Sequence, residues 1–395
     1  MNRKALIIGA GAQGSVIATN LAECSYVSEI VLSDIYLEKA KKTANRLNNE
    51  KIFTSKVDAN DVKDIKKASK EMDLVINATT WNPEFNLNIM EACKENNAHY
   101  QDMASEPCRQ LKLDDEWKKT GLTALIDTGI APGFSNVLVA EGADKFGSVD
   151  EVRIRLYAEG ETEKPVSLWS PETAWEDMVR ETIMYIDGDF KDVPPFSGEE
   201  TYEFPDLGPK TVYYHSHEEP KTLPKFIDKG LNYLDFKMGG TEFPIAKAFY
   251  EFGLFGEEPI DVKGVKVAPR DVLLELVPPT PSMEEIEEMV KNREISFKGC
   301  LLVEVKGEIK GKEKRYIRYL QPPTIEQISK IMPGANPVAY GTSMPASMFA
   351  RLILKGKIKT RGVIPPEALE SKVRKEFLEK LEDKYMGTEE KIEDL

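Results

Sequence analysis

The sequence predicts an α/β protein with two domains: a doubly wound parallel sheet, then an α+β domain with a mostly antiparallel sheet. Apolar runs alternate with amphipathic segments through the first 130 residues, which is typical of β–α–β crossovers. After about residue 147, period-two alternation of apolar and polar residues indicates half-buried antiparallel strands. The length of 395 residues exceeds what one hydrophobic core usually organises.

The elements of the first domain follow from short apolar runs and from helical spacing between them. The runs predict six strands, at residues 4–8, 29–34, 52–58, 73–79, 98–103 and 123–129. The intervening segments predict helices at residues 12–23, 36–48, from 61 onward and 85–96. Ligands of such sheets bind beyond the carboxyl ends of the strands. Polar residues at those ends are therefore the candidate site residues.

A glycine-rich turn follows the first strand. Gly9, Gly11 and Gly14 open the first helix, and Asp34 ends the second strand. This is the context that a Rossmann-type dinucleotide site requires, and the alternative is a glycine turn without a ligand. The candidate cofactor-binding residues are Gly9, Ala10, Gly11, Ala12, Gln13, Gly14, Asp34, Asp58, Ala59, Ala78 and Thr79.

Asp34 also bears on the choice of cofactor. Its carboxylate is expected to accept hydrogen bonds from the adenosine ribose and to repel a 2′-phosphate. No arginine follows immediately to neutralise that phosphate. We therefore expect NAD to be favoured, with NADP as the other cofactor that this turn admits. The alternative makes Asp34 a solvated acid at a strand end.

Two more carboxylates follow strands at the same edge of the predicted sheet. Asp102 lies in the segment HYQDMASE, and Asp127 lies in IDTGIAPGFSNVLV. We expect both to face the nicotinamide end of the cofactor, where at least one orients an amine or relays its proton. The alternative makes the second segment a domain junction in which Asp127 caps backbone amides. His99 begins the fifth strand, at the wrong end for the cofactor, and is expected to be structural.

The second domain is expected to span residues 131–336, after a nucleotide-binding domain at residues 1–130. Alternating residues predict strands at 151–160, 300–309 and 314–320. Residues 337–395 are expected to form C-terminal helices that return to the first domain, led by an apolar helix at 343–358. The charged tail is expected to begin as a helix and to end in a solvent-exposed segment.

The second domain also offers polar candidates. Glu172 lies between Trp169 and Trp175, and an acid beside indoles suits an ammonium group; the alternative is a capped helix with aromatic packing. His215 is a candidate proton carrier, and the alternative, which the sequence favours, is an ordinary surface histidine. His215 and His217 point to one side if they lie on a strand, but no third ligand is visible, so no metal site is expected. Four arginines lie on predicted strands, where solvated charge on a strand face is the default interpretation; the alternative is that one of them binds a substrate carboxylate. They are Arg153, Arg155, Arg315 and Arg318.

These motifs resemble the saccharopine dehydrogenase family. The resemblance rests on the glycine turn, HYQDMASE and above all DTGIAPGFSNVLVAEGADKFG. Later segments, such as SLWSPETAWEDMV and GTSMPASMFARLILKGKIKTRGVIPPE, are similar to its short-chain members, among which lysine 6-dehydrogenases are nearest. The similarity runs in patches over nearly the whole chain.

The resemblance implies an NAD(P)-dependent oxidoreductase of amino-acid metabolism that oxidises the C–N bond of a basic amino acid through an imine. The first alternative is a reductase that condenses an amine with an aldehyde, of the saccharopine or carboxynorspermidine type. The second is a dinucleotide-binding sensor or scaffold without catalysis. Asp102, Asp127, Glu172 and His215 are the catalytic candidates.

Composition limits the partners. The formal net charge of −14 argues against nucleic acid or an anionic membrane as the main partner. Neither a secretory signal nor a spanning segment is evident, and the four cysteines are far apart. We therefore expect a cytoplasmic enzyme with a small basic amino acid or polyamine-like substrate, assembled as a homodimer or homotetramer.

Overall fold

The computed structural model describes residues 2–163 and 166–395, and of Glu172 it describes only the backbone. The chain divides into two compact units. The first unit comprises residues 1–147, 221–229 and 339–387, and the second comprises residues 148–220, 230–338 and 388–395. Each unit is thus assembled from three separate stretches of the chain.

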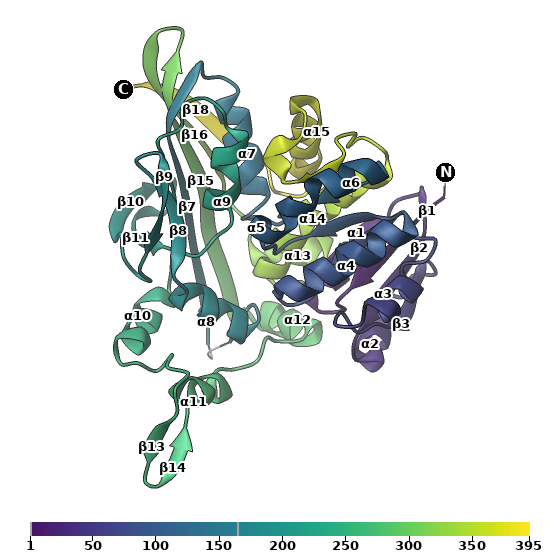
Figure 1. The fold of residues 1–395 in the computed structure, drawn as a ribbon. Coiled ribbons are helices and arrows are strands. Elements are labelled where there is room, and N and C mark those ends of the chain that lie inside the picture. The colour runs from purple at the N-terminus through teal and green to yellow at the C-terminus, as the bar shows by residue number, and fades with distance from the viewer. Residues whose placement is uncertain (1, 164–165) are drawn as a thin grey trace. The chain divides into compact units, whose positions relative to one another are not determined.

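The first unit contains a parallel sheet in the order β17-β6-β5-β4-β1-β2-β3 (Figure 1). Its strands are β1 (Arg3–Ile8), β2 (Val27–Asp34), β3 (Ile52–Lys56), β4 (Leu74–Asn77), β5 (His99–Asp102), β6 (Thr123–Leu125) and β17 (Gly362–Ile364). Its helices are α1 (Ala12–Ala22), α2 (Leu37–Leu47), α3 (Val62–Ala68), α4 (Pro83–Asn96), α5 (Pro107–Gln110), η1 (Leu111–Leu113), α6 (Asp114–Thr120), α7 (Phe134–Ala143), α14 (Pro337–Leu354), η2 (Pro366–Ala368) and α15 (Ser371–Glu382), and the first two residues of α14 belong to the second unit. The six predicted strands and the doubly wound fold are confirmed.

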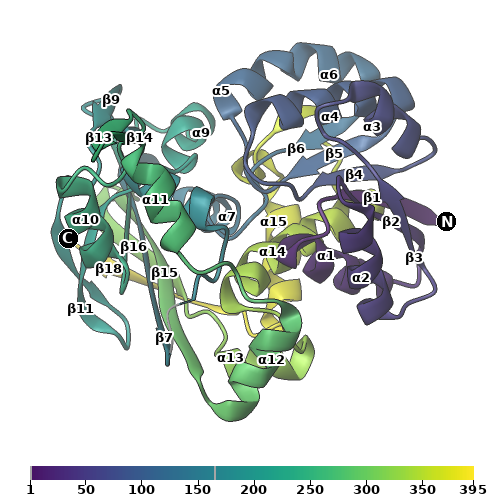
Figure 2. The ribbon, with the colours of Figure 1, turned by 90° about the horizontal axis from the view of Figure 1, so that it is seen from below.

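Helices cover both faces of this sheet. Figure 2 shows α3, α4 and α6 on one face and α1, α2 and α14 on the other. Under the first face lies a core cluster that includes Ile65, Ile89 and Trp117, all fully buried. Under the second face, the Gln101 side chain donates a 2.8 Å hydrogen bond to the Ala346 carbonyl of α14. Both faces are therefore closed to water, as a parallel sheet requires.

The second unit contains a nine-stranded sheet. Its main path is β10-β11-β12-β7-β15-β16-β18, with β8 and β9 attached beside β12. Among the described strands of this sheet, only β12 and β7 pair in parallel. The strands are β7 (Ser148–Thr162), β8 (Thr182–Ile186), β9 (Asp189–Val193), β10 (Glu200–Phe204), β11 (Gly208–Tyr214), β12 (Tyr233–Gly240), β15 (Ile295–Ile309), β16 (Lys312–Leu320) and β18 (Thr388–Asp394). The unit also contains a separate hairpin of β13 (Ile260–Val262) and β14 (Val265–Val267), and helices α8 (Pro171–Val179), α10 (Phe243–Glu251), α11 (Pro269–Leu276), α12 (Met283–Asn292) and α13 (Ile325–Ile331); α9 (Glu219–Phe226) crosses the unit boundary. The predicted mostly antiparallel sheet is confirmed.

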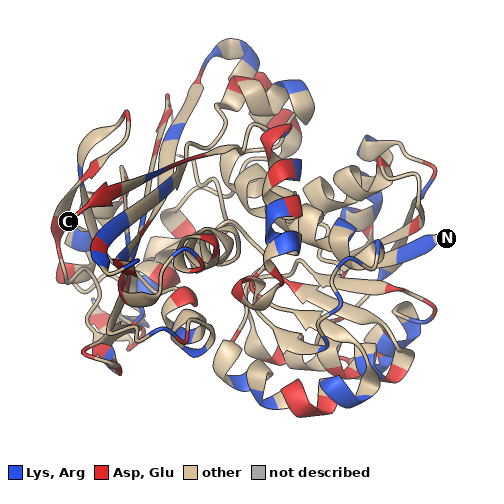
Figure 3. Cartoon of the chain, turned by 90° about the horizontal axis from the view of Figure 1, so that it is seen from above, with Lys and Arg blue, Asp and Glu red and all other residues tan. Residues whose placement is uncertain are grey.

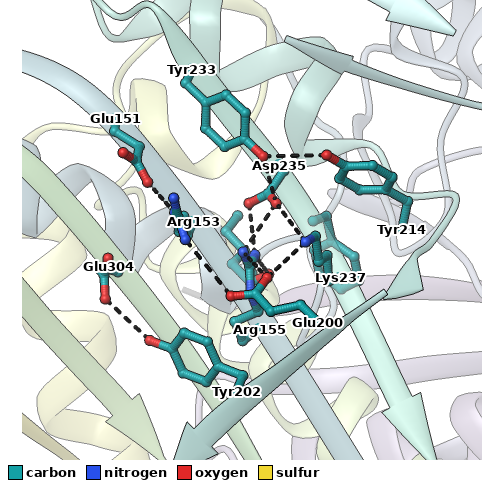
Figure 4. A network of polar contacts seen from close by, with 12 residues as sticks. Glu151, Arg153, Arg155, Glu200, Tyr202, Tyr214, Tyr233, Asp235, Lys237 and Glu304 are labelled. Atoms are coloured by element: carbon teal, nitrogen blue, oxygen red, sulfur yellow. Dashed lines mark hydrogen bonds and ion pairs between the residues drawn. The ribbon is translucent and has the colours of Figure 1, made fainter. Parts of the chain in front are cut away.

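A charged network fixes the β10–β11 hairpin against one face of this sheet (Figure 4). The fully buried Arg155 guanidinium donates to both carboxylate oxygens of Asp235, at 2.7 and 3.0 Å, and to Glu200 of β10 at 3.0 Å. Lys237 donates to the same Glu200 carboxylate at 2.7 Å, and Tyr202 donates to Glu304 at 3.2 Å. Because Arg155 and Asp235 are fully buried, each of these two charges needs its partner.

The four strand arginines considered as substrate ligands have protein carboxylates as neighbours. Arg153 pairs with Glu151, and Arg315 lies 2.6 Å from Glu393. Arg318 donates to Thr388 at 2.8 Å and lies 3.5 Å from Glu390. These contacts favour a role in sheet cohesion for the arginines.

The C-terminal residues form a strand where the sequence indicated a solvated end. β18 pairs with β16 so that acids oppose bases: Glu393 faces Arg315, and Glu390 faces Arg318. Cross-strand pairs of opposite charge stabilise an antiparallel ladder. Figure 3 shows this mostly acidic strand at the C label and shows charges of both signs interspersed elsewhere. Among the helices of residues 2–163 and 166–395, none combines the length and hydropathy needed to cross a bilayer.

Candidate active site

The glycine turn after β1 is packed so tightly that two positions exclude a side chain. Gly9 has a φ of +111°, and a Cβ there would lie 2.3 Å from the Ala78 carbonyl oxygen. A Cβ on Gly14 would lie 1.9 Å from the Gly9 oxygen. These two glycines therefore bring β1, α1 and β4 together, as the sequence motif predicted.

Gly11 differs from the other two because the space above it is open. The nearest described atom to a Cβ at Gly11 is the Lys39 ammonium nitrogen, at 3.9 Å. Gly11 immediately precedes α1, whose first residues are Ala12 and Gln13. Backbone amides at a helix N-terminus bind phosphate, and a glycine lets the phosphate approach them. The turn thus fits the pyrophosphate of a dinucleotide.

Asp34 lies at the end of β2 and is 7% exposed. One carboxylate oxygen accepts a 3.0 Å hydrogen bond from the Ala10 amide, and the other accepts one of 3.0 Å from the Tyr36 amide. The Lys39 ammonium of α2 lies 3.6 Å from the same carboxylate. The acid is held beside the glycine turn, and a flexible cation stands next to it.

The remaining cofactor candidates lie at the carboxyl ends of β3 and β4. Asp58 follows β3 and accepts a 2.8 Å hydrogen bond from the Asn60 amide, while the neighbouring Ala59 is buried. Ala78 follows β4 and lies against Gly9. Thr79 donates its hydroxyl to the Asn77 side chain at 2.7 Å. All four therefore lie at the predicted edge of the sheet, although their contacts with a cofactor stay a prediction.

Asp102 is fully buried at the end of β5 and is surrounded by donors. One carboxylate oxygen accepts from the Tyr100 hydroxyl and from the Gln110 amide group, each at 2.8 Å. The other accepts a 2.8 Å hydrogen bond from the Asp127 backbone amide. Asp102 therefore holds Asp127 in place, which favours a positioning role for it.

Asp127 lies in a strained turn after β6. It is fully buried and has a φ of +59°, which is uncommon for a residue other than glycine. Gly133 closes the turn, since a Cβ there would lie 2.4 Å from the Gly129 oxygen. The Asn136 side chain accepts from the Gly133 amide at 2.8 Å and donates to Glu367 at 3.0 Å. The turn is thus rigid, and Asp102 and Asp127 are brought together as the sequence suggested.

His215 and His217 follow β11 in the second unit. Their ring centroids are 5.4 Å apart, and His217 stacks on Phe236 at 3.7 Å. The Nδ1 atom of His215 lies 3.1 Å from the Ser216 carbonyl, so Nδ1 carries the proton; no described group partners Nε2. Burial, with the charge of His217 as a smaller contribution, lowers the pKa of His215 to about 3. His215 is therefore neutral at physiological pH.

Acidic neighbours act on His217. Its Nδ1 atom lies 3.0 Å from the buried carboxylate of Glu219. Burial alone would lower the pKa of His217, but Glu219, with Glu218 and Asp177, raises it above its usual value. For the Asp177 carboxyl, burial has the opposite effect and raises the pKa to about 7. The two neighbouring imidazoles are thus shifted in opposite directions, with the pKa of His215 lowered and that of His217 raised.

The Glu172 side chain lies outside the described part of the structure; its backbone belongs to α8. Trp175 of the same helix packs against Phe249 and Phe255, with ring centroids 5.9 and 5.5 Å away. That packing accounts for this indole without a ligand. Within the described residues, no group of three or more His, Cys, Asp or Glu side chains is arranged to hold a metal ion.

Sequence reasoning missed three residues of the site. Lys39 lies five positions after Asp34, on the first turn of α2, so the helical spacing of basic residues would have indicated it. Tyr100 precedes Asp102 by two residues and therefore shares its face of the strand. Gln110 has no such signal, because its contact with Asp102 depends on how α5 folds back.

The two parts of the chain match two family domains. Residues 5–125 match the saccharopine dehydrogenase NADP binding domain, and residues 129–386 match the saccharopine dehydrogenase C-terminal domain. A carboxyaminopropylagmatine dehydrogenase of Synechocystis sp. is 26% identical over 384 residues, with 93% of each chain covered. A carboxynorspermidine synthase of Vibrio cholerae is 26% identical over 397 residues, with 92% of each covered.

A solved structure is similar over the same length. The apo saccharopine dehydrogenase (L-Glu forming) of Saccharomyces cerevisiae superposes with a TM-score of 0.74 and 14% sequence identity. The match covers 99% of this chain and 100% of that one. At this identity, the similarity establishes the fold of the chain.

Proposed function

Because the chain belongs to the saccharopine dehydrogenase family, whose NAD(P)-binding oxidoreductase fold it shares, we propose that its substrate is a carboxylated secondary amine of the polyamine type. The observation that carries this proposal is the similarity over more than nine-tenths of the chain to relatives named for carboxynorspermidine and carboxyaminopropylagmatine. It favours the reductase interpretation of the sequence over a lysine 6-dehydrogenase.

The proposed reaction joins a primary amine to an amino acid that carries an aldehyde. The amine attacks the aldehyde carbon and water leaves, which gives an imine. The reduced nicotinamide, when bound, supplies the hydride to the imine carbon. One proton adds to the nitrogen, and the product is a secondary amine. The reverse direction oxidises the same C–N bond and hydrolyses the imine.

The two buried acids of the first unit support a division of roles. The Asp127 carboxylate is proposed to hold the substrate amine and relay its proton, because the rigid turn fixes Asp127 at the carboxyl end of the sheet. Asp102 is proposed to position Asp127 through the 2.8 Å bond to its amide. A residue so fully engaged in hydrogen bonds is poorly suited to transfer a proton itself.

His215 and Glu172 are proposed as substrate-binding residues. The lowered pKa of His215 argues against it as a proton carrier at neutral pH. Its Nε2 atom is instead a hydrogen-bond acceptor, which suits the N–H group of an amine. Glu172 stays a candidate for a remote ammonium group, on the sequence argument alone.

The glycine turn and Asp34 bear on the cofactor. Asp34 favours NAD through the ribose hydroxyls, as the sequence indicated. The Lys39 ammonium, 3.6 Å from that carboxylate, supports NADP as well, because it offers a cation for a 2′-phosphate. We propose that the chain uses both cofactors, with the preference set by this pair.

A substrate screen tests the proposal. The purified protein is incubated with short diamines or polyamines, an amino-acid semialdehyde and NADH or NADPH. Oxidation of the cofactor is followed by absorbance, and the product is identified by mass spectrometry. We expect a product whose mass equals both substrates minus water plus two hydrogens.

A second arm of the screen tests the alternatives. Basic amino acids are offered with NAD and NADP at alkaline pH, and released ammonia is measured. Ammonia release without condensation would identify a lysine 6-dehydrogenase-type enzyme and refute the proposed substrate. Tight cofactor binding without turnover in either arm would identify the non-catalytic sensor or scaffold.

A further inference from the structure

A hairpin of the second unit stands apart from the main sheet. β13 and β14 form a two-stranded sheet of their own, joined by Lys263 and Gly264, which both have positive φ. Figure 1 shows the hairpin extending beyond α11, away from the nine-stranded sheet. Residues 257–266 form an uninterrupted run of exposed residues. An isolated two-stranded hairpin is marginally stable in water, so this one needs additional contacts.

One face of the hairpin is entirely apolar. Ile260 pairs with Val267, and Val262 pairs with Val265, so these four side chains share one face. Ile260, Val262 and Val265 are 54%, 49% and 61% exposed. The other face carries the cross-strand pair of Asp261 and Lys266. Both faces of the hairpin are therefore exposed, and one of the two is apolar.

The exposed apolar side chains of the protein concentrate around this hairpin. Eight of the fifteen large hydrophobic side chains that are exposed in the described residues lie within residues 245–276, which we call the arm. They are Ile245, Tyr250, Phe252, Ile260, Val262, Val265, Val272 and Leu276. From their exposed fractions and about 150 Å² or more for each large side chain, they offer roughly 700 Å². One side of a standard protein interface buries about 800 Å².

The charges at the edges of the arm are of both signs. Lys263 and Lys266 are exposed on the hairpin, while Glu257, Asp271 and Glu275 are exposed at its base and on α11. Such a surface is complementary to itself when two copies meet about a two-fold axis, since bases of one copy can meet acids of the other. An anionic membrane would instead favour bases alone.

The arm also carries a groove that can receive side chains from the arm of a second copy. Beside the hairpin lies a groove of about 540 Å³ with a mixed lining. Its apolar walls are Pro259, Val267, Ala268 and Leu274, and its charged walls are Glu257, Lys266, Arg270 and Asp271. Its apolar wall suits a valine or isoleucine side chain, and its charged wall offers both signs of charge to the partner copy. In a two-fold contact the same surface of both chains takes part, so that surface must carry both the projecting side chains and the groove that receives them.

We propose that the arm is the surface through which two copies of this chain associate. The apolar face of the hairpin packs against the arm of the second copy, and the hairpin gains there the contacts that it lacks alone. Association through the arm is independent of the chemistry proposed above.

Sedimentation of the whole protein tests this proposal. We expect the wild type to sediment as a dimer or a larger even-numbered assembly and to dissociate on dilution. Val262→Asp places a charge on the apolar face and is expected to weaken association at least about 100-fold, as for loss of a central interface contact. Phe190→Asp is the matched control, because Phe190 is 51% exposed on β9, outside the arm. It is expected to leave association unchanged.

Three outcomes would overturn the proposal. They are a wild type that is monomeric at every concentration, a Val262→Asp variant that associates like the wild type, and a Phe190→Asp variant that is weakened equally. If circular dichroism shows that Val262→Asp fails to fold, hydrogen exchange of the wild type at different protein concentrations tests the proposal instead. Amides of β13 and β14 should exchange faster on dilution. Exchange that does not change with concentration would overturn the proposal.

Discussion

Replacing Gly11 with alanine is expected to separate dinucleotide binding from the stability of the fold. The backbone at Gly11 has a φ of −76°, which alanine adopts without strain. A Cβ there has the Lys39 ammonium nitrogen, 3.9 Å away, as its nearest described neighbour. The cofactor-free variant should therefore keep its free energy of unfolding within about 0.5 kcal/mol, as is usual for an uncrowded substitution.

Cofactor binding should respond differently. The pyrophosphate must approach the backbone at Gly11, and a methyl group in a packed contact costs about 2 kcal/mol. That cost corresponds to a dissociation constant for NADH or NADPH that is about 30-fold larger. Titration of the cofactor's fluorescence or its heat of binding measures this constant directly.

Thermal unfolding gives a second, independent measure. At a cofactor concentration of about 100 Kd, binding stabilises the wild type by about 2.7 kcal/mol. The same concentration is only about 3 Kd for the variant, which leaves about 0.9 kcal/mol. The melting temperature of the variant should therefore rise much less when cofactor is added.

Gly14→Ala provides the contrasting control. Its Cβ would lie 1.9 Å from the Gly9 carbonyl oxygen, so the backbone must move. This variant should lose about 3 kcal/mol or more of stability even without cofactor. The reasoning is refuted if Gly11→Ala binds both cofactors as tightly as the wild type, or if Gly11→Ala is destabilised as much as Gly14→Ala.

Four other substitutions test the site. Lys39→Glu should lower kcat/KM about 10-fold more with NADP than with NAD, since it adds an acid beside Asp34; equal losses in steady-state kinetics would contradict this. Asp102→Asn should lower the free energy of unfolding, measured with urea, by about 2–4 kcal/mol, because the new side-chain NH₂ group faces hydrogen-bond donors where the carboxylate oxygen accepted from them. Asp127→Asn should keep its stability within about 1 kcal/mol, since asparagine tolerates positive φ, and lose about 100-fold in kcat/KM; near-normal turnover would exclude Asp127 from proton transfer. The folded pKa of His215 lies below its unfolded value, so its stabilising contribution is present above about pH 6.5 and is lost as the pH falls towards 3. Between about pH 7.5 and about pH 5, the wild type should therefore lose about 2 kcal/mol more than His215→Asn, and parallel pH profiles would argue against the buried neutral imidazole.

The sequence predicted the first unit well where local patterns determine the structure. Strands buried on both faces appear as apolar runs, and the glycine turn has a fixed spacing to Asp34. β17 was missed because Gly362–Ile364 is too short to show periodicity, and it becomes a strand only by pairing with β6. The distant partner, rather than the local sequence, decides its conformation.

The second unit was predictable only in its long strands. β7, β15 and β16 alternate over many residues, whereas β18 is so rich in acids that it resembles a solvated tail. Its pairing depends on the basic residues of β16, about seventy positions earlier. Likewise, position along the sheet predicted Asp102 and Asp127 as neighbours. The three donors that hold Asp102 depend on side-chain geometry that no local pattern reports.

The pairing of β17 with β6 has a consequence for biosynthesis. The hydrogen bond from Thr123 to the Thr360 carbonyl joins residues 237 positions apart. While the ribosome is still translating the intervening segment, β6 is an open edge of the nascent sheet, and such edges pair with other chains. Contacts of high sequence separation also slow folding. Newly made chains should therefore depend on chaperones until β17 has emerged, and expression at low temperature should raise the yield of native protein.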